Sequence, residues 1–137
     1  ELKEHAQRLG VKNIYFMGYL PEEDKVTLLK LCYAKVFPSH LRSEAFGISL
    51  LEGAMYGKPM ISSEIGTGTT HINVDGETGI VVPPSDSAAL GEAMRKLLDN
   101  PDLAAEYGRN AENRYKKHFT AKRMSREYFE LYKSILK

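Results

Sequence analysis

The sequence predicts a doubly wound α/β domain, in which helices cover both faces of a parallel sheet. Short apolar segments alternate with longer amphipathic ones up to about residue 100. The short segments are apolar at successive positions, as in strands that are covered on both faces. Most of them are followed by a segment of helical periodicity, which indicates strand–helix–strand units. The chain opens at Glu1 inside a helix-like segment, so we expect a domain that lacks its first strands.

The first part of the chain predicts two helices and two strands. Residues 1–9 have helical spacing, and residues 13–17 (NIYFM) form an apolar strand. Pro21 opens the next helix, because proline suits a first turn and the three acids behind it favour the positive helix end. Residues 34–37 (AKVF) form a second strand.

The middle of the chain repeats this alternation. Residues 40–46 form a loop, and a helix follows over 47–56. Residues 60–62 form the third strand, and residues 64–70 form a polar, glycine-rich turn. Residues 79–82 (GIVV) form the fourth strand, so the predicted sheet ends here.

The last part of the chain is helical throughout. Asp86 or Ser85 caps a helix that carries an apolar stripe at helical spacing. Two further helices trail behind it, over 101–118 and 120–136, and Thr120 caps the second of them.

Composition narrows the classes of function. The 137 residues, 42% of them hydrophobic, suit one domain that spans 1–137. The 19 Lys and Arg against 18 Asp and Glu give a net charge of +1, which argues against a nucleic-acid-binding protein. Cys32 is the single cysteine, so a reducing, cytoplasmic compartment is expected. The basic excess over 106–137 has two interpretations, which are a solvated face and a peripheral contact with anionic membrane lipid.

Residues 44–52 (EAFGISLLE) place one acid before a glycine and a second acid on the helix behind it. Ligands of open α/β sheets bind beyond the carboxyl ends of the strands, where this loop lies. The start of a helix offers unpaired N–H groups that suit a phosphate, and Gly47 allows close approach. Glu52 follows about 7–8 Å further along the helix axis. Two carboxylates on either side of a phosphate site match the two hydroxyl-rich ends of a nucleotide sugar.

This stretch resembles the E-x7-E motif of retaining GT-B glycosyltransferases, in particular family four. Four further elements of that family occur in the family's order along nearly the whole chain. They are Gly18 after an apolar strand, Pro38-Ser39 before the motif, the run 52–59 (EGAMYGKP), and the series Asp75-Gly76, Gly79, Pro83 and Asp86. The resemblance implies the Rossmann-like C-terminal domain of a two-domain enzyme, truncated at its N-terminus and without the N-terminal acceptor domain.

The resemblance also implies roles at particular positions. Glu44 would be the catalytic-site acid that contacts the donor sugar, and Glu52 would hydrogen-bond the ribose. Backbone N–H groups at Phe46, Gly47 and Ile48 would hold the sugar and diphosphate. The base would lie against the turn formed by Gly18, Tyr19 and Leu20.

Some residues keep two interpretations. His40 either contacts the donor sugar or lies in solvent, and Tyr19 either stacks on the base or lines the core. Ala45 replaces a glycine that is common in the family, and His71 falls where many members have a glutamate, so no role follows for it. The four histidines lack metal-ligand spacing, so we expect no metal and no other cofactor.

The expected function is hexosyl, by preference mannosyl, transfer from a GDP- or UDP-sugar to a saccharide or lipid-linked acceptor, with retention of configuration, as in polysaccharide or lipopolysaccharide synthesis. The isolated chain is expected to be inactive, because the acceptor domain is absent. Two alternatives stay open, a non-catalytic nucleotide-sugar-binding module and an epimerase or phosphorylase of the same fold. A paired-carboxylate glycosidase fits less well, because it does not explain Gly47.

Overall fold

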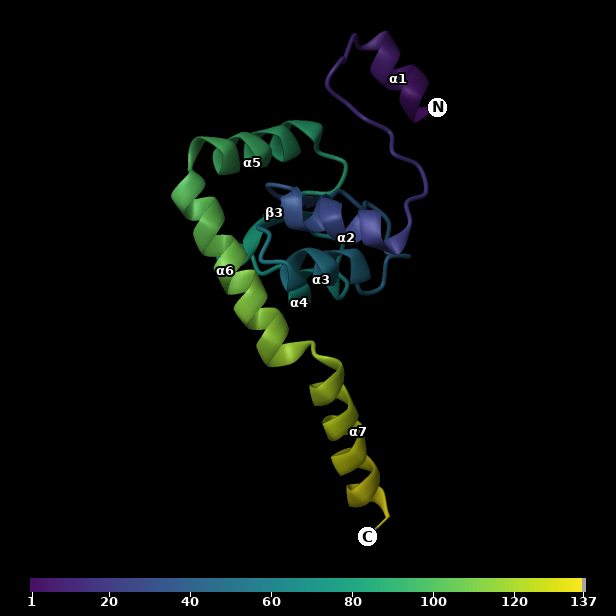
Figure 1. The fold of residues 1–137 in the computed structure, drawn as a ribbon, viewed down its shortest axis with the longest axis vertical. Coiled ribbons are helices and arrows are strands. Elements are labelled where there is room, and N and C mark those ends of the chain that lie inside the picture. The colour runs from purple at the N-terminus through teal and green to yellow at the C-terminus, as the bar shows by residue number, and fades with distance from the viewer. Residues whose placement is uncertain (137) are drawn as a thin grey trace.

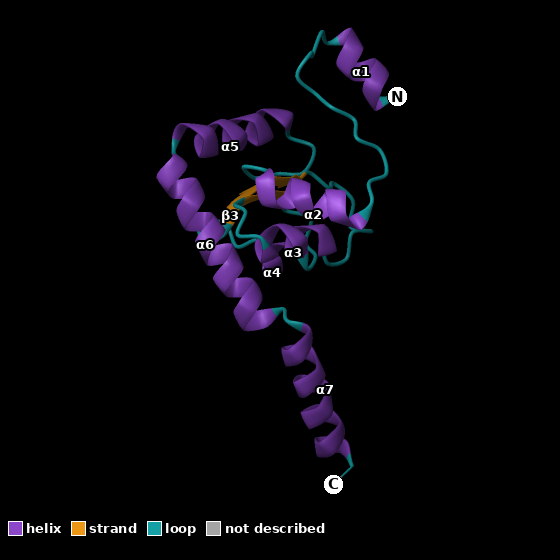
Figure 2. Ribbon diagram, in the orientation of Figure 1, coloured by secondary structure: helices purple, strands orange, loops and turns teal. Residues whose placement is uncertain are grey.

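The structure is a computed structural model, and it describes residues 1–136. An α/β body lies between two helical ends that extend away from it (Figure 1). Figure 2 shows that strands occur only in the body, whereas both ends are helical. The elements are α1 (Leu2–Arg8), α2 (Glu22–Leu31), β1 (Lys35–Phe37), α3 (Ile48–Met55), β2 (Met60–Ser63), α4 (Thr69–Ile72), β3 (Gly79–Val82), α5 (Ser87–Asp99), α6 (Pro101–His118) and α7 (Ala121–Ile135).

The sheet is parallel, as the sequence predicts. Its order is β1-β2-β3, with Val36 opposite Ile61 and Ile61 opposite Ile80. All four residues of the central strand β2 are buried, which is the environment that an apolar segment covered on both faces requires. The strands end together at one edge of the sheet, and the loops that follow them lie at that edge.

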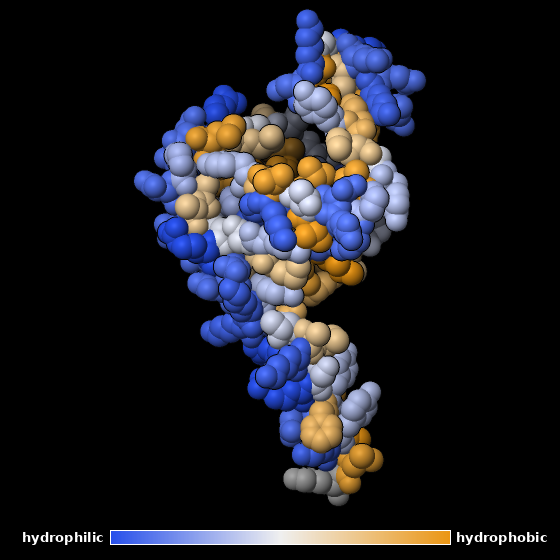
Figure 3. Space-filling view, viewed as in Figure 1, coloured by the Kyte–Doolittle hydropathy of each residue, from blue (hydrophilic) through white to orange (hydrophobic). Residues whose placement is uncertain are grey.

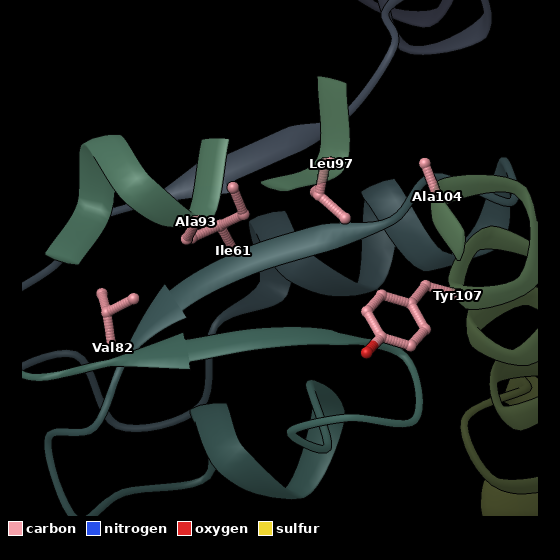
Figure 4. Packing of buried hydrophobic residues seen from close by; sticks show 6 residues of the cluster. All are labelled: Ile61, Val82, Ala93, Leu97, Ala104 and Tyr107. Atoms are coloured by element: carbon pink, nitrogen blue, oxygen red, sulfur yellow. The ribbon is translucent and has the colours of Figure 1, made fainter. Parts of the chain in front are cut away.

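One face of the sheet packs against α5 and the first half of α6. Ile61 and Val82 from the strands meet Ala93 and Leu97 from α5, and Figure 4 shows these side chains pointing into one layer. The same layer includes Tyr107 of α6, which is only 6% exposed. Of the apolar stripe predicted on the helix after Asp86, Leu90 and Leu97 pack in this core, whereas Met94 and Leu98 are 44% and 63% exposed.

The opposite face of the sheet packs against α3 and α4. Met60 points to this face, where Leu50 of α3 and Ile72 of α4 cover it. Ala111 in the second half of α6 joins the same cluster, so α6 passes along the body and contributes to both layers. Helices on both faces of a parallel sheet confirm the predicted fold class.

Two predicted elements are wrong. Residues 13–17 form no strand: a strand needs a neighbouring backbone to pair with, and none lies beside this segment in the part of the chain described here. Tyr15 in its middle is 82% exposed. Residues 64–70 are not turn throughout, because α4 begins at Thr69, whose side chain is buried together with that of Ile72 one turn later. Burial of both side chains against α3 stabilises this single turn.

The remaining boundaries agree with the predictions to within one or two residues. Asp86, not Ser85, caps α5, because its side chain accepts a hydrogen bond from the Ala89 N–H at 2.9 Å. Thr120 caps α7 in the same way through the Arg123 N–H. Over residues 1–136 no helix has the length and apolar content that a membrane crossing demands.

Candidate functional site

The two loops that follow β1 and β2 meet at the carboxyl edge of the sheet. The Gly68 N–H donates a hydrogen bond to the Ala45 carbonyl oxygen at 2.9 Å, which joins the second loop to the first. A Cβ on Gly68 would lie 2.7 Å from Phe46 Cδ2 and 3.0 Å from that same carbonyl oxygen. The close contact therefore depends on a residue without a side chain.

Gly47 makes the turn from the first loop into α3. It has a φ of +93° and a ψ of +53°, which only glycine adopts readily. A Cβ there would lie 3.2 Å from both Leu50 Cδ1 and Thr69 Cγ2, so the position is also crowded. Backbone conformation and lack of space thus require glycine at position 47 within the fold itself. This is in addition to the close approach of a ligand that the sequence predicts.

Glu44 is held by the turn that it precedes. One carboxylate oxygen, Oε1, accepts a hydrogen bond from the Gly47 N–H at 2.9 Å, and the side chain is half-buried. The Gly47 N–H, one of the three groups predicted to hold the donor sugar and diphosphate, therefore donates its hydrogen bond to Glu44 in this structure. The N–H groups of Ile48 and Ser49 remain at the start of α3, and the hydrogen bonds among residues 1–136 use neither of them.

Glu52 is held by a residue from another helix. Its Oε1 lies 2.8 Å from Lys25 Nζ, and the same ammonium lies 2.9 Å from Glu22 Oε2. The hydrogen bonds to Glu52, and then to Glu22, raise the pKa of Lys25 above its ordinary value, since they favour the charged ammonium. Sequence reasoning missed Lys25, because 27 positions separate it from Glu52 and no local pattern joins them.

The other predicted residues make no hydrogen bond to either glutamate in the described chain. Gly18 has a φ of +66°, Tyr19 is 93% exposed and Leu20 is half-buried, just before α2 begins. His40 lines a hollow of about 190 Å³ beside Pro83 and the cap of α5. The structure therefore brings His40 to the β3–α5 turn.

Phe46 and His71 both direct their rings to the end of α6. The Phe46 ring packs edge-on against Phe119 with centroids 6.3 Å apart, and the His71 ring does so at 5.5 Å. Arg114 Nε and Nη2 donate hydrogen bonds to the His71 carbonyl oxygen at 3.1 and 2.6 Å. The predicted interaction of Phe46 with a donor thus concerns its backbone, since its side chain is engaged in packing.

The arrangement offers hydrogen-bond acceptors before and after a helix start that has unpaired N–H groups. Glu44 precedes α3 and Glu52 follows on its second turn, and each has one oxygen engaged within the protein. The contacts among residues 1–136 leave the other oxygen, Oε2, of each side chain without a hydrogen-bond partner. Such carboxylates accept hydrogen bonds from hydroxyl groups, and the free N–H groups of α3 favour an anion between them.

Known proteins that resemble this chain are sugar transferases. The family model for glycosyl transferases group 1 matches residues 1–114. The chain is 67% identical over 121 residues to the D-rhamnosyltransferase WbpZ of Pseudomonas aeruginosa, a match that covers 88% of this chain and 32% of that protein. It is 51% identical over 136 residues to the O-antigen chain mannosyltransferase C of Escherichia coli, which covers 99% and 37%.

A solved structure shares the fold. Sucrose-phosphate synthase from Thermosynechococcus elongatus superposes with a TM-score of 0.89 at 26% identity, over 98% of this chain and 33% of that one. The chain thus spans about a third of the length of the curated relatives it matches.

Proposed function

The chain belongs to the group 1 glycosyl transferases, and we propose that it binds the nucleotide-diphosphate sugar of a hexosyl transfer that retains the anomeric configuration. The observation that supports this most directly is the pair of glutamates around the start of α3. Each keeps one carboxylate oxygen engaged in the protein and the other without a partner. A ligand with hydroxyls at both ends and phosphates in the middle fits that arrangement.

The proposed roles follow the order of groups along α3. Glu44, in the loop, accepts hydrogen bonds from the sugar hydroxyls, and Glu52 accepts them from the ribose. The N–H groups of Ile48 and Ser49 contact the diphosphate at the positive end of the helix dipole. The segment over 18–20 provides the surface for the base.

The chemistry asked of these groups is electrostatic. Breaking the bond between the anomeric carbon and the diphosphate leaves negative charge on the phosphate oxygens and positive charge on the sugar ring. The start of α3 stabilises the first charge, and the Glu44 carboxylate stabilises and orients the second. The acceptor hydroxyl then attacks from the face that the diphosphate leaves and gives its proton to the departing diphosphate oxygen, which keeps the configuration.

The relatives support a particular class of donor. One is named for D-rhamnosyl transfer and the other for mannosyl transfer, and D-rhamnose is the 6-deoxy form of D-mannose. We therefore propose a donor of manno configuration, carried by GDP or UDP. The O-antigen in the second name supports a saccharide or lipid-linked acceptor.

Ligand-observed NMR tests the donor site. The full-length protein is presented with GDP-mannose, UDP-glucose and ADP-glucose, and the same panel is applied to the 137-residue chain alone. We expect one base to be selected by the full-length protein, weaker binding by the chain alone, and loss of binding in Glu52→Ala. Glu92→Ala, which removes an exposed acid of α5, is the matched control and should bind as the wild type does.

The outcomes separate the proposal from its alternatives. Unchanged binding in Glu52→Ala, or no binding of any nucleotide sugar by the full-length protein, contradicts the site. Glu44→Gln keeps an oxygen for the Gly47 N–H but removes the charge, so the transfer rate should fall about 100-fold or more with little change in donor affinity. Donor epimerisation or phosphorolysis without transfer would replace the reaction while keeping the site.

A further inference from the structure

The ion pair between α2 and α3 joins the helix that follows the proposed base segment to the helix that carries the proposed ribose contact. Lys25 Nζ lies 2.8 Å from Glu52 Oε1, across 27 positions of sequence. The side chains of Lys25 and Glu52 are 38% and 31% exposed, so both are partly shielded from water. Besides this pair, Lys58 Nζ donates a hydrogen bond to the Lys30 carbonyl oxygen at the far end of α2.

The position of α3 is fixed by contacts that do not involve Glu52. Leu50 and Ala54 are buried in the core cluster beneath it. A Cβ on Gly53 would lie 3.0 Å from the Lys35 Cβ, so α3 lies close against β1. The backbone of Glu52 is therefore placed by packing, and its carboxylate has only Lys25 as a partner within residues 1–136.

Lys25 binds one oxygen of the Glu52 carboxylate and leaves the other oxygen free of contacts with Lys25. Oε1 accepts a hydrogen bond from the ammonium, while Oε2 has no hydrogen-bond partner in the described chain. Glu22 lies one turn earlier on α2 and is 75% exposed. Its Oε2 lies 2.9 Å from Lys25 Nζ and forms a second ion pair with the same ammonium. With two of its three protons engaged, the ammonium is restrained toward Glu52, and the raised pKa keeps it charged at all physiological pH values.

We propose that Lys25 is a positioning residue for the nucleotide's ribose, acting through Glu52, and that it thereby ties the base segment to the ribose contact. The inference rests on the proposed function, since it needs a ribose at Glu52. The base segment, residues 18–20, immediately precedes α2, so the ion pair links the helix next to it with α3. Holding Oε1 limits the rotamers of Glu52 and leaves Oε2 to accept from a ribose hydroxyl.

The test compares GDP with 2′,3′-dideoxy-GDP, using calorimetry on the full-length protein. Lys25→Met and Glu52→Gln each remove one partner, a double variant removes both, and Lys30→Met on the exposed last turn of α2 is the matched control. If UDP is the nucleotide bound, UDP and its dideoxy analogue take their place. Thermal unfolding checks folding, which Lys25→Met should preserve because partly exposed pairs contribute little stability.

Lys25→Met is expected to weaken GDP binding roughly three- to tenfold and to leave dideoxy-GDP binding unchanged. The double variant should be no weaker than Glu52→Gln, since Lys25 acts through Glu52. An equal loss for both ligands would overturn the inference, because the lysine would then act on the diphosphate by charge. No loss for either ligand would also overturn it. Equal binding of GDP and dideoxy-GDP by the wild type would instead remove the ribose contact, and with it the proposed site.

Discussion

The helices α6 and α7 follow one another with only Phe119 and Thr120 between them, and both carry apolar residues at helical spacing, yet only one of them is part of a core. α6 buries side chains in both layers of the body, whereas α7 buries none. Its apolar residues remain open to solvent, and Figure 3 shows such residues exposed along this helix. Met124, Tyr128, Leu131, Tyr132 and Ile135 are 51–69% exposed.

The difference comes from the small residues on α6, which allow close packing, and from the direction of α7, which leads away from the body. α6 approaches the body closely where Gly108 faces the backbone of Gly57, and Ala104 and Ala111 are small enough to keep it there. α7 leaves the body after Phe119. Between α7 and the body lies an open groove of about 550 Å³, which Phe46 and Leu51 line on the side of the body. The comparison teaches that amphipathic spacing predicts a helix and its apolar face, but not whether anything covers that face.

The largest expected effect comes from a glutamate introduced on each of the two helices. Ala111 of α6 is 1% exposed, so Ala111→Glu places a carboxylate in a core that offers it no partner. We expect a loss of about 4 kcal/mol or more in the free energy of unfolding. Tyr132→Glu on α7 should change it by less than about 0.5 kcal/mol. Urea unfolding followed by circular dichroism measures both, and equal losses would show that α7 is packed in solution.

A smaller effect tests the close approach of α6. A Cβ at Gly108 would overlap the Gly57 carbonyl oxygen, so Gly108→Ala must displace α6 from the body. The expected loss is about 2–3 kcal/mol. The control is Gly91→Ala on α5, where nothing lies within 4 Å of the added atom and a gain of about 0.5–1 kcal/mol is expected. A neutral Gly108→Ala would mean that the two backbones separate at no cost.

The helix caps sharpen the comparison on a scale of about 1 kcal/mol. Asp86→Ala removes the cap of α5, which packs in the core, so it should lower the urea midpoint of the whole body. Thr120→Ala removes the cap of α7, so it should accelerate hydrogen exchange in α7 and leave that midpoint unchanged. Thr120→Ser should restore slow exchange. A lower midpoint in Thr120→Ala would contradict the independence of α7.

The smallest effect is a pH dependence at the joint between the two helices. Partial burial, and then the charges of Arg114, Arg123 and Lys117, lower the pKa of His118 below its ordinary value. The unfolded chain therefore takes up the proton first. The contribution of neutral His118 is complete above its unfolded pKa of about 6.5, and it is lost as the pH falls through the lower folded-state pKa.

Hydrogen exchange over residues 117–124, corrected for the intrinsic effect of pH, measures this. We expect faster local opening at about pH 5.5 than at pH 7.5. His118→Gln should remove the difference. A pH dependence that persists in His118→Gln would assign the effect to another group.

The candidate site shows how far local pattern extends. The spacing of Glu44, Gly47 and Glu52 is local, so the sequence predicts that the two acids flank the start of a helix. In the structure α3 begins at Ile48, one residue after the predicted start. The contact between Lys25 and Glu52 joins two helices, and the Gly68 contact joins two loops. No periodicity or spacing encodes such contacts, because the folded chain alone determines which elements lie side by side.

By itself the sequence determined the order and type of nearly all elements, the caps of α5 and α7, and the parallel sheet, because propensity, capping and periodicity act within a few residues. Only the tertiary structure decided what each apolar face meets. In the folded chain residues 13–17 have no strand partner within the described residues, and Thr69 is buried in α4. The apolar face of α6 is buried, whereas that of α7 is exposed. Burial and strand pairing need a second surface at the right distance, and that surface comes from residues far away in the chain.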